Sequence, residues 1–344
     1  MKLSWEPITL DLKTTFRIAH GASDQRFNVV ARLEHAGLEG LGEGPGVTYL
    51  GESQAGMIAY LESVAHLMVG DPALLEDSLE RLPPGSHAAR AALDMALHDL
   101  WGKLVGQPLY RLFGLNPARI PPTSFTIAID RPEVMAEQAQ RSGYPIIKIK
   151  VGSDQDEAIV RAIRRAIEAR LRVDANAGWS LQQAADLIPR LAQYDLEMIE
   201  QPLPVGDIEG LRWLRQHLHD QHIHLPIFAD ESIKTSRNII DHAGAIDGVV
   251  IKLAKTGGLR EALRLIAVAR AFEMQVMVSC MVETSLGVTA AAHLAPLCDY
   301  VDLDGPLLIR NDPFQGLRYQ GAQIILPDSP GLGVNWAAAP MSSP

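Results

Sequence analysis

The sequence predicts an α/β fold: a modified (β/α)-barrel of the TIM-like kind, joined to a smaller N-terminal α+β unit. From about residue 122, short apolar stretches alternate with amphipathic helical patterns, which is typical of a parallel sheet with right-handed crossovers. We count eight such stretches, the number of strands in a closed barrel. We expect the α+β unit over residues 1–120, the barrel over 121–310, and a C-terminal segment over 311–344 that returns to the α+β unit.

The N-terminal unit contains strand-like stretches at Ile8–Leu12 and Val29–Leu33, followed by a helical pattern over His87–Gly114. Five glycines lie between residues 37 and 46. Their spacing lacks the third glycine of a GxGxxG phosphate loop, and no helical pattern follows them. We therefore predict turns between strands at these glycines.

The barrel strands are expected where apolar stretches end in polar residues. They are Ser124–Ile129, Ile146–Val151, Arg172–Asn176, Met198–Gln201, Ile227–Asp230, Val249–Leu253, Val276–Cys280 and Val301–Asp304. Helical patterns between them include Asp156–Ala169, Leu181–Tyr194 and Leu259–Phe272.

The composition excludes several classes of protein. A net charge of −10 over 344 residues argues against nucleic acid or an anionic membrane surface as partner. The chain shows no signal-peptide pattern and no apolar run of 18 residues. Cys280 and Cys298 have no CxxC spacing, so we expect reduced core cysteines. These features predict a cytoplasmic protein.

Two lysines, Lys148 and Lys150, lie in a stretch that otherwise has the composition of a buried strand. Residues two apart in a strand share a face, so both ammonium groups point the same way. Because a buried ammonium group is costly, an anionic or metal-bound partner must face them.

Three carboxylates supply that partner, because Asp174, Glu200 and Asp230 end three consecutive predicted strands. Active groups of a barrel come from the carboxyl ends of its strands, so these side chains converge. Like charges so close together require a cation. Oxygen ligands without histidine or cysteine favour Mg²⁺, with Mn²⁺ as the second choice.

Lys150 and Lys252 follow the second and sixth strands and therefore face each other across the barrel mouth. A lysine acts as a base near neutral pH only where burial or nearby positive charge lowers its pKa. We expect Lys148 and the metal ion to supply that charge. A substrate carboxylate on the metal could then lose its α-proton to one lysine and regain a proton from the other. This arrangement predicts epimerisation or racemisation through an enediolate.

The motifs around these residues resemble the muconate-lactonising subgroup of the enolase superfamily over essentially the whole chain. They are Lys148-Ile149-Lys150, Asp174-Ala175-Asn176, Glu200-Gln201-Pro202, Asp230-Glu231-Ser232 and the stretch from Ile251 to Gly258. The resemblance implies that Asp174, Glu200 and Asp230 bind the metal and that Lys150 and Lys252 are the acid/base pair.

The resemblance implies further roles and an architecture. Lys148 would help to hold the substrate carboxylate, and Asn176 and Glu231 would support the metal ligands. The N-terminal unit would be a capping domain with substrate-specificity loops, completed by the C-terminal segment. Members with this architecture often form symmetric oligomers, so we expect a homo-oligomer.

The eighth strand resembles that of dipeptide epimerases, in which two aspartates bind the free α-ammonium of the substrate. Here they are Asp302 and Asp304, which lie two residues apart in the predicted strand, share a face and together favour a cation. The resemblance predicts a dipeptide substrate epimerised at its C-terminal residue. Further substrate contacts are expected from Thr126, Cys280, Met281 and Val282.

The preferred dipeptide depends on the capping loops. Ala-Glu epimerases carry an arginine where this chain has Gly21, next to His20; Arg17 and Arg26 are out of register. Without that arginine an acidic substrate side chain loses its charge partner. The loop around Tyr49 is mostly apolar. We therefore expect a hydrophobic residue at the epimerised position, with a cationic residue as the alternative.

Other reactions fit the same lysines and carboxylates. A muconate cycloisomerase or an o-succinylbenzoate synthase-like lyase is the nearest alternative, although Asp302 and Asp304 would repel their anionic substrates. From a different class, a metal-dependent aldolase or hydrolase barrel needs no second lysine opposite the first. A non-catalytic barrel would tolerate substitution of Lys252.

Overall fold

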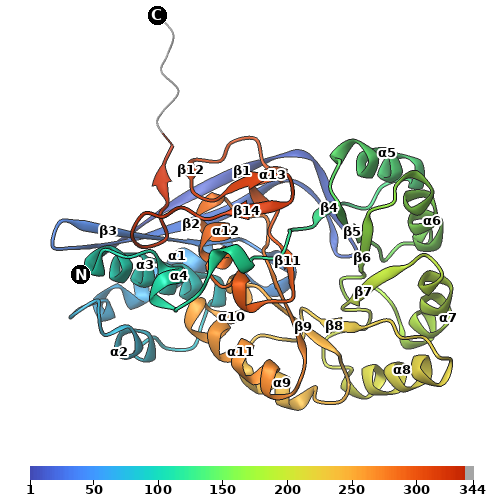
Figure 1. The fold of residues 1–344 in the computed structure, drawn as a ribbon. Helices are drawn as coiled ribbons and strands as arrows, with labels where there is room; N and C mark the ends of the chain where they lie inside the picture. The colour runs from blue at the N-terminus through green and yellow to red at the C-terminus, as the bar shows by residue number, and fades with distance from the viewer. Residues whose placement is uncertain (338–344) are drawn as a thin grey trace, which may run out of the picture.

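The computed structural model describes residues 1–337 and divides them between an N-terminal sheet with its helices and a parallel barrel. The sheet is a meander of three antiparallel strands: β1 (Lys2–Ile18), β2 (Gly21–His35) and β3 (Leu38–Gly44). These strands are longer than the sequence pattern predicts. Figure 1 shows them with their helices on one side of the molecule and the barrel on the other.

The prediction of turns at the glycine cluster is wrong for three of its members. Gly40, Gly42 and Gly44 lie inside β3 and face the helix α3 (His87–Val105). A Cβ atom at Gly42 would lie 2.0 Å from the carbonyl oxygen of Ala92. The glycines are therefore needed for close packing of the strand on the helix.

The remaining elements of the N-terminal unit are short. They are α1 (Gln54–Val64), α2 (Leu75–Glu80), α4 (Leu109–Leu112) and the 3₁₀ turns η1 (Thr48–Leu50), η2 (Ala65–Leu67) and η3 (Pro117–Arg119). The single helix expected over residues 87–114 is divided, because Gly106 has φ +74° and ends α3.

The barrel prediction is confirmed, with strand ends displaced by at most two residues. Eight parallel strands follow one another in sequence order. They are β4 (Phe125–Ile127), β5 (Ile146–Lys150), β6 (Arg170–Asp174), β7 (Leu196–Glu200), β8 (Ile227–Ala229), β9 (Gly248–Ile251), β10 (Gln275–Ser279) and β11 (Tyr300–Asp302). A bridge between Thr123 and Val301 joins the first strand to the last.

Helices cover the outside of the barrel, and the best-formed of them match the predicted ranges. They are α5 (Pro132–Ser142), α6 (Asp156–Ala166), α7 (Leu181–Ala192), α8 (Ile208–Asp220), α9 (Ser236–Asp241), α10 (Leu253–Thr256), α11 (Leu259–Ala271), α12 (Ser285–Ala292), η4 (Ala295–Leu297) and α13 (Gly305–Leu308). Inside the barrel, Met198, Phe228, Val250 and Met277 form a buried apolar cluster. No helix in residues 1–337 is long and apolar enough to cross a membrane.

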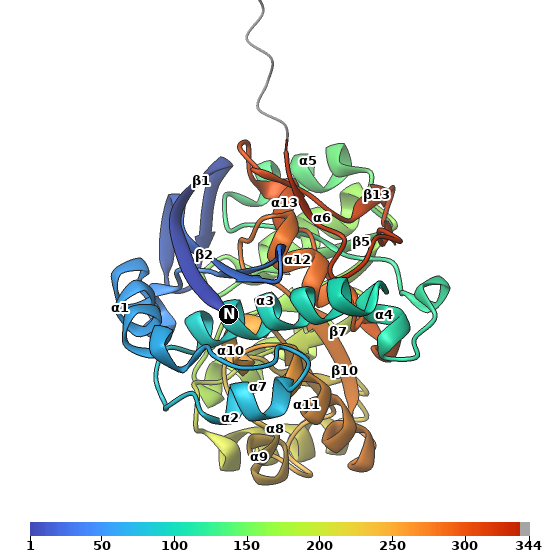
Figure 2. The same ribbon diagram turned by 90° about the vertical axis from the view of Figure 1, so that its left-hand side faces the viewer.

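The C-terminal segment forms four short strands and returns to the N-terminal unit (Figure 2). The strands are β12 (Phe314–Gln315), β13 (Arg318–Gln320), β14 (Gln323–Ile325) and β15 (Asn335–Trp336). The Leu332 N–H donates to Asp99 of α3 at 2.8 Å, and the Leu109 N–H donates to the Gly331 carbonyl at 3.0 Å. The domain boundaries at residues 120 and 310 remain predictions, and residues 338–344 of the last segment lie outside the described part.

Candidate active site

A cavity of about 600 Å³ lies between the carboxyl ends of the barrel strands and the loops of the N-terminal unit. Its barrel side contains Lys148, Lys150 and Lys252, and its capping side contains residues of β1, β2 and the loop that holds η1. The predicted site residues are thus brought to one place.

Three carboxylates meet beneath this cavity. Asp174 ends β6, Glu200 ends β7, and Asp230 follows β8 directly; all three are buried. One oxygen of each lies within 4.8 Å of the others. An all-oxygen donor set at this spacing fits a hard divalent cation such as Mg²⁺.

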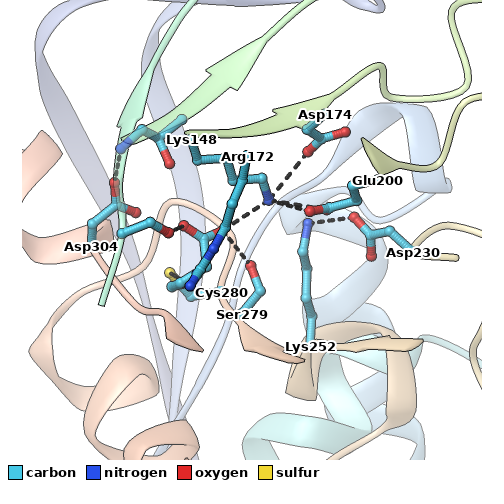
Figure 3. Close-up of polar contacts among 12 residues, drawn as sticks. Lys148, Arg172, Asp174, Glu200, Asp230, Lys252, Ser279, Cys280 and Asp304 are labelled. Atoms are coloured by element: carbon cyan, nitrogen blue, oxygen red, sulfur yellow. Dashed lines mark hydrogen bonds and ion pairs between the residues drawn. The ribbon is translucent and has the colours of Figure 1, made fainter. Parts of the chain in front are cut away.

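The charges of these carboxylates are balanced by lysines (Figure 3). Lys150 Nζ lies 2.5 Å from Asp174 Oδ2, and Lys252 Nζ lies 2.7 Å from Asp230 Oδ2. Burial acts to raise the pKa values of Asp174 and Asp230, but the lysines outweigh it and hold both well below the usual range. Burial, reinforced by Asp174, raises the pKa of Glu200 well above its usual value.

Lys148 contacts protein carboxylates on three sides. Its Nζ lies 2.8 Å from Asp302 Oδ2, 3.0 Å from Glu200 Oε1 and 3.2 Å from Asp174 Oδ2. Burial alone would lower its pKa, but these carboxylates hold the pKa well above its usual value. The ammonium group therefore links Asp174 and Glu200 of the carboxylate triad to Asp302.

Asp302 and Asp304 both line the cavity but have unequal surroundings. Asp302 accepts hydrogen bonds from Lys148, from Ser279 Oγ at 2.8 Å and from Ser124 Oγ at 2.6 Å. Burial opposes ionisation, but Lys148 lowers the pKa of Asp302 to about 2.

Asp304 lies beyond the end of β11, so the two aspartates are not on one continuous strand. Its Oδ2 accepts from the Thr126 N–H at 2.6 Å. Burial, with a contribution from Asp302, raises the pKa of Asp304 to about 7. Asp304 is therefore less strongly paired within the protein than Asp302 is.

Asn176 is hydrogen-bonded to both Asp174 and Glu231 beside the three carboxylates. The Asn176 N–H donates to Asp174 Oδ1 at 2.9 Å, and its Nδ2 donates to Glu231 Oε1 at 3.1 Å. Asn176 has φ +44°, a left-handed conformation that asparagine tolerates better than most residues. This turn places the amide between the two carboxylates.

The predicted specificity residues lie on the capping side and at the end of β10. The rings of His20 and Tyr49 stack with centroids 4.7 Å apart, and Tyr49 Oη lies 3.9 Å from Met281 Sδ. Cys280, Met281, Val282 and Gly21 also line the cavity. The stack joins the loop after β1 to the loop of η1.

Several site residues were not singled out from the sequence. Lys255 contacts Asp230, and Gln201 Oε1 accepts from the Asp230 N–H at 2.9 Å. Both lie close in sequence to predicted site residues, Gln201 next to Glu200 and Lys255 three residues after Lys252. Arg26 of β2 lines the cavity as well.

Comparison with known proteins agrees with this geometry. Residues 133–339 match the family model "Enolase C-terminal domain-like", and residues 6–114 match "Mandelate racemase / muconate lactonizing enzyme, N-terminal domain". The chain belongs to this enolase-like family. The family assignment predicted from the motifs is therefore confirmed.

Relatives within the enolase-like family include dipeptide epimerases. The L-Ala-D/L-Glu epimerase of Bacteroides thetaiotaomicron is 39% identical over 97% of this chain and 88% of its own length. The substrate-liganded L-Ala-D/L-Glu epimerase of Bacillus subtilis has a TM-score of 0.92 at 32% identity, covering 98% of this chain and 100% of its own. The dipeptide epimerase of Enterococcus faecalis V583 with Mg and L-Leu-L-Tyr has a TM-score of 0.91 at 33% identity. The match covers 97% of this chain and 98% of that protein.

Proposed function

We propose that the protein is a Mg²⁺-dependent dipeptide epimerase that acts at the α-carbon of the C-terminal residue. The observation that carries this proposal is the placement of Lys150 and Lys252 on opposite sides of the three carboxylates. Lys150 belongs to β5, and Lys252 follows β9, four strands away in an eight-stranded barrel. A proton can thus leave one face of the substrate and return to the other.

The site residues would have separate roles in this reaction. Asp174, Glu200 and Asp230 would hold the metal ion. When bound, Mg²⁺ would take up carboxylate charge that otherwise holds the lysines, and would stabilise negative charge on the substrate carboxylate as the α-proton leaves. Lys150 and Lys252 would exchange the α-proton, each at its own face.

Asp304, assisted by Asp302, would bind the α-ammonium of the dipeptide. This pair also argues against the cycloisomerase and lyase alternatives, because two carboxylates in the cavity wall repel anionic substrates. The apolar side chains of Phe16, Ile18 and Val47 on the capping side support a hydrophobic side chain at the epimerised residue.

One observation favours a second specificity, for an acidic side chain. Arg26 lines the cavity, and in residues 1–337 no carboxylate oxygen lies within 4.0 Å of its guanidinium. Its recorded contacts are the Gln25 carbonyl at 2.9 Å and the face of Phe16. A half-buried guanidinium without a carboxylate partner attracts an anionic group.

The test is α-proton exchange in D₂O, followed by NMR with Mg²⁺ present, on L-Ala-L-Phe, L-Ala-L-Glu and L-Ala-L-Lys. The proposal expects deuterium at the C-terminal α-carbon, a new diastereomer, and loss of both when EDTA removes the metal. No exchange with any dipeptide would contradict it. If L-Ala-L-Glu is turned over fastest and Arg26→Met abolishes that advantage, the enzyme prefers an acidic side chain and the hydrophobic preference is wrong.

The expectations of a cytoplasmic location and a homo-oligomer also remain predictions. Light scattering coupled to size-exclusion chromatography measures the oligomeric mass directly. A monomer at micromolar concentration would contradict the second expectation.

A further inference from the structure

Lys255 is a fully buried lysine that the proposed reaction leaves without a role. It lies in α10, the single turn that follows β9, and its side chain is 0% exposed. Its Nζ donates to the carbonyl oxygen and to Oδ1 of Asp230, and to the Val250 carbonyl at 3.1 Å. An ammonium group has three protons to donate, so these acceptors satisfy it completely.

Lys255 and Lys252 hold the Asp230 carboxylate from two sides. Lys252 donates to Oδ2 and lines the cavity, whereas Lys255 donates to Oδ1 and is absent from the cavity wall. Lys252 can therefore turn toward a substrate. Lys255 has no such freedom, because its other acceptors are backbone carbonyls.

We propose that Lys255 is a positioning residue for the metal ligand Asp230. It keeps Oδ1 engaged and fixes the plane of the carboxylate that would bind Mg²⁺. This inference rests on the metal site of the proposed function. It assigns to Lys255 a step in metal binding and none in proton transfer.

Charge and orientation predict opposite effects on metal affinity, which makes the inference testable. Removing a positive charge next to a cation site strengthens cation binding by Coulomb's law. Removing a group that orients a ligand weakens binding, typically by 10- to 100-fold. A loss of affinity in a charge-removing variant therefore identifies the positioning role.

The experiment measures Mg²⁺ binding to the substrate-free protein by calorimetry and Mn²⁺ binding by electron paramagnetic resonance. Lys255→Met removes the charge at similar length, and Lys255→Arg keeps the charge but changes the shape. We expect both to weaken binding by about tenfold or more. The matched control is Lys234→Met, which removes a half-buried lysine in the loop after β8; it should change the affinity by less than about twofold.

Unchanged or tighter Mg²⁺ binding by folded Lys255→Met would overturn the inference, and circular dichroism establishes folding. If that variant does not fold, the Mg²⁺ affinity of Lys255→Arg serves as the test instead. If neither folds, Lys255 serves the fold rather than the metal, and the inference fails. Metal binding needs no substrate, so wild-type protein that binds Mg²⁺ but exchanges no dipeptide proton would contradict the proposed function alone.

Discussion

Two regions of this molecule gather buried carboxylates, and they hold them in different ways. At the barrel mouth, Asp174 and Asp230 are held by lysine ammonium groups. At the seam between the capping sheet and α12, Glu43 of β3 is held by Asn28 Nδ2 at 2.8 Å and by the N–H groups of Thr284 and Gly287 at 3.1 Å.

The difference distinguishes a site whose partners can move during a reaction from a contact that only stabilises the fold. Backbone N–H groups are fixed in the fold and cannot leave, so Glu43 keeps its partners throughout any reaction. Lysine side chains are long and flexible, so at the mouth they can give way to a metal ion or substrate. The seam in turn steadies the wall of the cavity, because Asn28 also donates to the Val282 carbonyl.

The sharpest test of the contrast is to remove a lysine at the mouth. Lys252→Met should lower the epimerisation rate by about 10²- to 10⁴-fold, the usual contribution of a general acid or base. Mg²⁺ binding should persist, because the three carboxylates remain. The rate is measured by NMR in D₂O, with Lys150→Met as the matched variant from the opposite face. Turnover within tenfold of wild type would contradict the two-lysine reaction.

Removing Glu43 at the seam should lower the free energy of unfolding and leave Mg²⁺ binding unchanged. Glu43→Ala leaves the donors on Asn28, Thr284 and Gly287 unpaired in a buried place. We expect a loss of about 3 kcal/mol in the free energy of unfolding, measured with denaturant. Mg²⁺ affinity of the folded variant should not change. A large loss of Mg²⁺ affinity would show that the two regions are not separate.

A pH profile distinguishes the carboxylate that is free for substrate from those already paired. Because the pKa of Asp304 is raised to about 7, Asp304 is neutral below that pH and cannot pair with the substrate ammonium. We expect kcat/KM to rise with pH through about 7, and Asp304→Asn to remove this step along with tight binding. A profile identical in the variant would assign the step to another group.

The smallest effect is expected at the capping loops. His20→Ala removes the stack on Tyr49, and aromatic pairs contribute about 0.5–1.5 kcal/mol. KM should therefore rise by roughly two- to tenfold, with kcat little changed. Tyr49→Phe keeps the stack and is the control, and an equal rise in KM there would assign the effect to the hydroxyl instead.

Much of the site could be predicted because it follows the regular geometry of strands. Asp174, Glu200 and Asp230 end apolar stretches, and carboxyl ends of parallel strands meet at one edge of a barrel. Asp304 shows the limit of this reasoning. The chain leaves β11 at Asp302, so the rule that residues two apart share a face no longer places the second carboxylate.

The sequence by itself determined the barrel, its cap and the set of lysines and carboxylates, because these depend on local periodicity and on the costs of burying charge. Only the tertiary structure decided the partners of each charge: Lys148 on Asp302, Lys255 behind Asp230, and Arg26 in the cavity wall. It also decided that Gly42 packs against α3. These contacts join residues far apart in the chain, and no local pattern encodes the distance between them.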